Sequence, residues 1–289
     1  MNIKTALKQF LHGVVSTDIK TLYHKSKNIK ELNSIQRIGC EINNLRDESD
    51  LFLENLFESS EIENMWNASK KEIDFFEIPD GSGGVNEGDS KAIYYLVSEL
   101  RPSSVLEIGT HIGASTLHIA SALYMSQLKN GKKVNLITVD IADVNSVITK
   151  PWLQYGAKYS PIEMINKFNY ETFVKFVADT SLNYIAECKQ KFDFIFLDGD
   201  HSASTVYQEI SMALKLLNKN GVILLHDYFP DMKPLWSNGS VISGPYLAIK
   251  RLMKECMHLN CLPLGRLPWS TKLSSNVTSL ALLLRKIHY

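Results

Sequence analysis

The chain alternates between short apolar runs and longer stretches in which apolar residues recur at helical spacing. Five runs are apolar on both faces and predict buried strands, at 104–110, 134–140, 174–180, 192–200 and 221–228. The stretches between and around them predict helices at 91–100, 114–129, 182–190, 204–217 and 245–256. Strands that are buried on both faces and separated by helices are typical of a parallel sheet with helices on both sides. The pattern therefore predicts an α/β fold.

Two further strands are expected near 261–268 and 279–287. Because no long helix separates them, they should form a hairpin. That connection would make the last strand antiparallel to its neighbours.

The first part of the chain differs in character. Apolar groups recur at helical spacing within residues 47–80, at Leu51, Leu53, Leu56, Phe57, Ile62, Met65 and Trp66. We expect residues 1 to about 75 to be mostly helical, which divides the chain into an N-terminal helical extension, 1–77, and a main domain, 78–289. The extension could be a cap, a contact in a homodimer, or a cover over a substrate pocket.

Two irregular segments flank the predicted elements. Glycines at 81, 83, 84 and 88 predict no regular structure over 78–90, with Asp89 or Ser90 capping the helix that follows. Residues 141–173 are long for a connection between two strands, so they form either a flap beside the active site or a passive insertion.

Composition limits the class of protein. The 31 basic and 31 acidic residues cancel, which argues against a nucleic-acid binder held mainly by phosphate contacts. No stretch approaches the roughly 18 apolar residues of a membrane span, and the N-terminus is a poor signal peptide. The four cysteines form no CxxC pair. We therefore expect a cytoplasmic globular protein that binds neither nucleic acid nor membrane.

Glycines punctuate the segment VLEIGTHIGAST, residues 105–116, in which a strand ends at Glu107 and a helix then begins. Gly109 and Gly113 let the backbone turn sharply and let a ligand approach the main chain. Free N–H groups at the helix start would face that ligand. The spacing is not G-x-G-x-x-G, so the dinucleotide fingerprint is imperfect.

Acidic residues follow the next two strands. Asp140 at the end of one strand could accept hydrogen bonds from both ribose hydroxyls of a nucleoside. Asp179 after the next could accept from the amino group of an adenine ring. Each could also be an ordinary surface residue.

The ends of the last two parallel strands carry more such groups. Asp198, Asp200 and His201 follow one strand, and His226 and Asp227 follow the other. Because the carboxyl ends of parallel strands share one edge of the sheet, these side chains should meet there. Carboxylates with an imidazole suit a divalent cation. The aromatic residues Tyr228, Phe229 and Trp236 either wall the neighbouring pocket or belong to a packed loop.

Together these motifs resemble the class I S-adenosylmethionine (SAM)-dependent methyltransferases, in the catechol and caffeoyl-CoA O-methyltransferase-like branch that includes bacterial relatives. The resemblance covers residues 78–289. It rests on the E-I-G-x-x-x-G turn, the D-G-D-H-S segment and G-V-I-L-L-H-D-Y. It implies a Rossmann-like, doubly wound, seven-stranded sheet that is parallel except for its last strand.

The resemblance also implies roles for individual residues. Cofactor contacts would come from the glycine turn and the next two strand ends, at Glu107, Gly109, Thr110, His111, Gly113, Ser115, Asp140 and Asp179. A metal, Mg²⁺ or another divalent cation, would be held by Asp198, His226 and Asp227. The family usually has Asp where this chain has His226, so a site without metal is also open. His201 takes the place of a lysine base, and Asp200 and Asp198 complete the catalytic candidates.

The sequence thus favours a SAM-dependent methyltransferase that acts on the hydroxyl of a small molecule, either with a divalent metal or without one. Two alternatives stay open. A nicotinamide-dependent oxidoreductase shares the alternating layout, and a nucleoside-binding protein could lack catalysis.

Overall fold

A single sheet lies at the centre of the molecule in this computed structural model, which describes residues 17–51, 55–79, 81 and 84–286. Its seven strands follow the order β3-β2-β1-β4-β5-β7-β6. They are β1 (Ser104–Ile108), β2 (Asn135–Asp140), β3 (Val174–Ala178), β4 (Phe192–Leu197), β5 (Leu217–Leu225), β6 (Leu259–Pro263) and β7 (Ala281–Arg285). Strands β1 to β5 pair in parallel, and β7 runs antiparallel to both β5 and β6. The predicted doubly wound sheet with an antiparallel last strand is confirmed.

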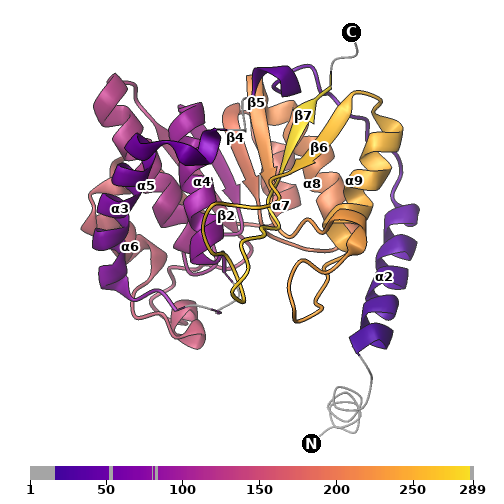
Figure 1. Ribbon diagram of the computed structural model, residues 1–289, viewed down its shortest axis with the longest axis horizontal. Coiled ribbons are helices and arrows are strands. Elements are labelled where there is room, and N and C mark those ends of the chain that lie inside the picture. The colour runs from indigo at the N-terminus through magenta and orange to yellow at the C-terminus, as the bar shows by residue number, and fades with distance from the viewer. Residues whose placement is uncertain (1–16, 52–54, 80, 82–83, 287–289) are drawn as a thin grey trace, which may run out of the picture.

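Helices cover both faces of this sheet (Figure 1). One face carries α3 (Ser60–Ile73), α4 (Glu87–Leu100), α5 (Ala114–Asn130) and α6 (Pro161–Lys167). The other carries α2 (Thr17–Ser34), α7 (Ser181–Glu187), α8 (Ala203–Ala213) and α9 (Gly244–Glu255). The five helices predicted in the main domain are all present, with ends that differ by a few residues.

Two hydrophobic cores lie on either side of the sheet. In β4, Phe194 and Phe196 belong to the core under α4 and α5, whereas Ile195 and Leu197 belong to the core under α8 and α9. Successive side chains of a strand point to opposite faces. The strand is therefore apolar at nearly every position because both of its faces are buried.

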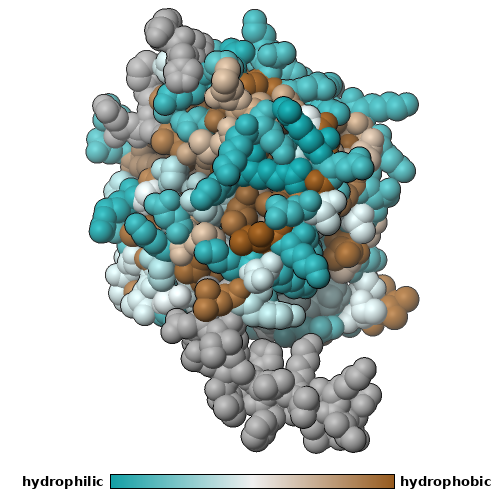
Figure 2. Space-filling view, turned by 90° about the vertical axis from the view of Figure 1, so that its right-hand side faces the viewer, coloured by the Kyte–Doolittle hydropathy of each residue, from teal (hydrophilic) through white to brown (hydrophobic). Residues whose placement is uncertain are grey.

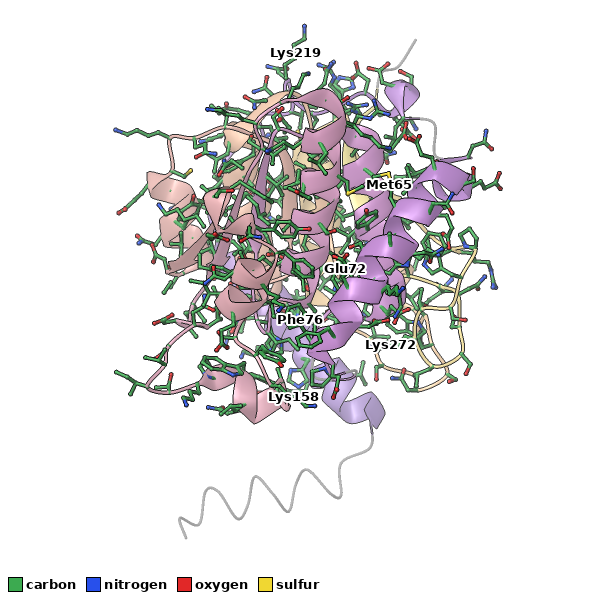
Figure 3. All side chains as sticks on the ribbon, turned by 90° about the vertical axis from the view of Figure 1, so that its left-hand side faces the viewer. Met65, Glu72, Phe76, Lys158, Lys219 and Lys272 are labelled. Carbon is green, nitrogen blue, oxygen red and sulfur yellow. The ribbon has the colours of Figure 1, made fainter. Side chains whose placement is uncertain are left out.

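The N-terminal extension contacts both faces of the sheet. After α2 the chain crosses the sheet at β5 and β7, where the backbone amide of Arg46 donates to Gly221 and Asp47 pairs with Arg285. It then reaches α3 on the opposite face, with Met65 and Glu72 on the helix and Phe76 just after its end (Figure 3). The helical prediction is therefore correct for α2 and α3 and wrong for 35–47, while residues 1–16 and Leu53 lie outside the described residues.

Helix α4 begins earlier than the sequence predicted. Asn86 accepts a hydrogen bond from the backbone N–H of Asp89 at 3.1 Å, so Asn86 is the cap, and Asp89 and Ser90 lie inside the helix. Gly88, expected in an irregular segment, is helical, and a Cβ there would lie 2.3 Å from the carbonyl oxygen of Ser270, so the position has no room for a side chain. Gly83 lies outside the described residues. The earlier start places the Asp89 carboxylate in the interior.

Candidate functional site

The turn after β1 comes very close to the turn after β4. Gly109 has φ of +101°, and a Cβ there would lie 2.2 Å from the carbonyl oxygen of Asp198. Only glycine fits this conformation and this approach. Gly113, with φ of +81°, starts α5. Both predicted glycines are therefore required by the backbone that surrounds the site.

Replacing Gly109 with alanine should lower the free energy of unfolding by about 3 kcal/mol, because the new Cβ meets the backbone of Asp198. Gly131 is the matched control, since it also has positive φ but has nothing within 4 Å. Gly131→Ala should cost only about 1 kcal/mol. Urea unfolding measures both variants, and equal losses would contradict the close approach.

Glu107 lies behind the turn and not in the cavity. It is fully buried and accepts hydrogen bonds from the hydroxyls of Ser115 at 2.6 Å and Thr116 at 2.5 Å. Burial raises the pKa of Glu107 to about 7, although these hydroxyls oppose the shift. Glu107 therefore ties the end of β1 to the first turn of α5, and its direct contact with a cofactor stays a prediction.

Asp140 anchors the glycine turn from the end of β2. One of its oxygens accepts from the backbone N–H of His111 at 2.8 Å, and the other accepts from that of Ala142 at 3.0 Å. His111 has φ of +50°, a strained conformation that this hydrogen bond helps to hold. Its ring packs 4.2 Å from that of Tyr155 in the 141–173 insertion.

A cavity of about 600 Å³ opens at the carboxyl ends of β1, β2 and β4. Six of the eight cofactor candidates line it: Gly109, Thr110, His111, Ser115, Asp140 and Asp179. Glu107 and Gly113 are the other two and are not among its lining residues. Ile141 also lines it, so the 141–173 insertion begins at the cavity wall.

Asp179 is held by its own neighbourhood. Its carboxylate accepts from the backbone N–H of Thr180 at 2.7 Å and from the side-chain amide of Asn183 at 2.8 Å. Thr180, Ser181 and Leu182 join it in the cavity wall. These three residues were not predicted from the sequence, and the helix start that follows β3 is the signal that could have indicated them.

The catalytic candidates line the same cavity from the end of β4. Asp198, Asp200 and His201 are all in its wall. Asp227, which follows β5 with φ of +55°, lies 3.6 Å from Nε2 of His201. Ligand atoms of Asp198, His201 and Asp227 all fall within 4.8 Å of one another, which is compatible with one divalent cation. Two of the three predicted metal ligands, Asp198 and Asp227, thus lie together with His201.

His226 takes a different position from the one expected. Its Nδ1 lies 2.9 Å from Asp198, and its Nε2 lies 3.2 Å from Asp89 on α4. Burial alone would lower the pKa of His226, but the carboxylates of Asp198 and Asp227 and the hydrogen bonds to Asp198 and Asp89 raise it well above its ordinary value. Both ring nitrogens face carboxylates, which favour the protonated form of the ring. Its predicted role as a metal ligand stays untested.

The aromatic residues after β5 do not line this cavity. Tyr228, Phe229 and Trp236 are all buried. The rings of Phe229 and Trp236 pack edge to face at 5.5 Å, and the indole N–H donates to Val277. Of the two readings left open, the packed loop is the one the structure supports.

The described helices also include none that is long and apolar enough to span a bilayer.

Comparison with known proteins gives a family for the part of the chain that holds these residues. Residues 106–228 match the model of a methyltransferase domain family. A curated relative, uncharacterized protein R132 of Acanthamoeba polyphaga mimivirus, is 29% identical over 127 residues, which are 43% of this chain. The chain spans about half the length of that relative.

Solved structures support the fold. The O-methyltransferase TomG from Streptomyces achromogenes, involved in tomaymycin synthesis and solved with SAM, gives a TM-score of 0.50 at 15% identity over 79% of this chain and 91% of its own. An O-methyltransferase from Bacillus cereus, solved with S-adenosylhomocysteine (SAH), gives 0.50 at 18% identity over the same shares.

The family match runs from β1 to just beyond β5 and includes every predicted site residue from Gly109 to Asp227. The fold of these structures is the Rossmann-like one found here. Residues 106–228 therefore match a methyltransferase domain, which agrees with the resemblance that the sequence motifs indicated.

Proposed function

We propose that this chain is a SAM-dependent methyltransferase that methylates a hydroxyl group of a small molecule. The observation that carries the proposal is one continuous cavity whose wall holds Gly109, Asp140 and Asp179 at one part and Asp198 and His201 at another. The first group suits a nucleoside, and the second suits proton transfer from an acceptor. A methyl donor and its acceptor could thus meet inside one site.

The residues present fit the cofactor. The cavity of about 600 Å³ falls within the usual range for small-molecule sites. Asp140 offers carboxylate oxygens where ribose hydroxyls would need acceptors. Gly109 lies in the cavity wall, so its main chain is within reach of a bound ligand. When bound, SAM supplies an electrophilic methyl group on its sulfonium sulfur.

The chain's own residues would position the acceptor and take its proton. The acceptor oxygen would take up the methyl group that bound SAM supplies, with SAH as the other product. The hydroxyl proton passes to His201, whose Nε2 lies 3.6 Å from Asp227. A carboxylate at this distance stabilises the imidazolium that results.

A divalent cation held by Asp198 and Asp227 beside His201 would lower the pKa of the acceptor hydroxyl. We expect the chelator-treated protein to bind one Mn²⁺ per chain. The loss of the EPR signal of free Mn²⁺ measures this binding. Asp227→Asn should abolish this binding. Asp200→Asn is the control, because Asp200 lies outside the group and its oxygens accept from Ser202 and Thr205. Absence of Mn²⁺ binding in the unaltered protein would leave His201 as a base without metal.

Calorimetry tests the cofactor. SAM and SAH should both bind with micromolar affinity, and NADH titrated in parallel should not bind. Binding of NADH alone would favour the oxidoreductase alternative, which the methyltransferase match disfavours. Binding of SAM without release of SAH in the presence of any acceptor would favour the nucleoside-binding alternative.

A further inference from the structure

A second cavity, of about 530 Å³, adjoins the first at the end of β4. Asp200 and His201 line both cavities, so they form the boundary between them. The remaining walls come from α2 and from residues 240–243, which precede α9. The catalytic candidate His201 therefore faces the cofactor cavity on one side and this second space on the other.

Helix α2 is firmly attached at this wall. The side-chain amide of Asn28 accepts from the backbone N–H of Ala203 at 2.7 Å and donates to Ser243 at 3.2 Å. Arg251 of α9 donates to the carbonyl oxygens of Leu32 and Ile35 at the other end of the helix. The wall is thus built by the N-terminal extension, outside the matched domain of residues 106–228.

We propose that this second cavity binds the methyl acceptor and that the acceptor is a neutral, polyhydroxylated, non-aromatic compound of the glycoside class. The inference rests on the proposed function, because it assigns the substrate side of the same site. It gives the N-terminal extension a role in substrate binding.

The lining supports this class of acceptor by its hydrogen-bonding groups. Helix α2 contributes His24, Lys27, Asn28 and Glu31, which offer donors and acceptors side by side. Each sugar hydroxyl both donates and accepts, so it is satisfied by such a mixture. Residues 240–243 add two serine hydroxyls and the apolar side chains of Val241 and Ile242, which suit the C–H face of a sugar ring.

The charges and the side-chain types of the lining argue against anionic and aromatic acceptors. Lys27 lies 3.7 Å from Glu31, and Asp200 adds a second carboxylate, so the wall holds no excess of positive charge that would attract an anionic acceptor. No Phe, Tyr or Trp is found among the described residues that line this cavity. The nearby aromatic residues Phe229 and Trp236 pack against each other in the interior. A flat catechol would therefore find no ring on which to stack. The face of the molecule that carries α2 mixes hydrophilic residues with hydrophobic ones, including a hydrophobic patch near its centre (Figure 2).

Saturation-transfer-difference NMR tests which class of acceptor binds. The full chain, with excess SAH filling the cofactor site, is mixed with one of two probes, methyl α-D-glucopyranoside or catechol. We expect transfer to the glucopyranoside and none to catechol. Lys27→Ala should weaken glucopyranoside binding about tenfold, as for one lost charge-assisted hydrogen bond. Lys30→Ala is the matched control, because Lys30 is exposed on the same helix and does not line the cavity.

Each outcome decides the inference. Binding of the glucopyranoside that Lys27→Ala weakens and Lys30→Ala preserves would support it. Binding of catechol in its place, binding of neither probe, or equal effects of the two variants would overturn it. Calorimetry with SAH on the same samples separates the two proposals: if SAH fails to bind, the proposed function falls, whereas if SAH binds and the glucopyranoside does not, only the acceptor assignment falls.

Discussion

Replacing Asp198 with alanine should lower the rate of methyl transfer by about 10³-fold or more, while the affinity for SAM changes little. Asp198 lies at the end of β4, accepts from Nδ1 of His226 at 2.9 Å, and belongs to the group with His201 and Asp227. Its loss would remove the carboxylate that orients this group, and it would leave the His226 ring with one fewer carboxylate partner. Release of SAH measures turnover, and calorimetry measures cofactor binding.

The control for this variant lies on the same strand. Asp193 accepts from the backbone N–H groups of Ser103 and Ser104 and from Asn218 at the opposite end of β4. Asp193→Ala should therefore lower stability without changing the turnover of the folded enzyme. Asp198→Asn preserves the side-chain volume if the alanine variant does not fold. Full activity of both Asp198 variants would contradict the catalytic role of Asp198.

Replacing Asp140 with alanine should weaken SAM binding about 100-fold. The change would remove the acceptor for the ribose hydroxyls and also the hydrogen bond that holds the backbone of His111 in its strained conformation. Asp143→Ala is the control, because Asp143 is exposed in the same loop and does not line the cavity. Unchanged affinity in the Asp140 variant would remove the ribose assignment.

The sheet was predictable from sequence for a physical reason. A strand such as β4 is buried on both faces, so its apolar run stands out, and the absence of a long helix between β6 and β7 predicted their antiparallel pairing. Each parallel strand also ends where a ligand can approach, so Asp140, Asp179 and Asp198 could be placed at one edge.

Other features depend on contacts that sequence spacing does not indicate. Asp89 looked like a helix cap, yet it meets His226 across the interior once Asn86 begins α4. The Asp89–His226 contact joins residues far apart in the chain, so only the folded arrangement shows that a predicted metal ligand has carboxylates at both ring nitrogens. The contact of α2 with α8 through Asn28 is of the same kind.

A crystal structure of the complex with SAH is the most direct test of these assignments. We expect the ribose at Asp140, the adenine beside Asp179, and the sulfur at the end of the cavity where Asp198 and His201 lie. SAH bound outside this cavity, or bound with its sulfur remote from Asp198 and His201, would contradict them.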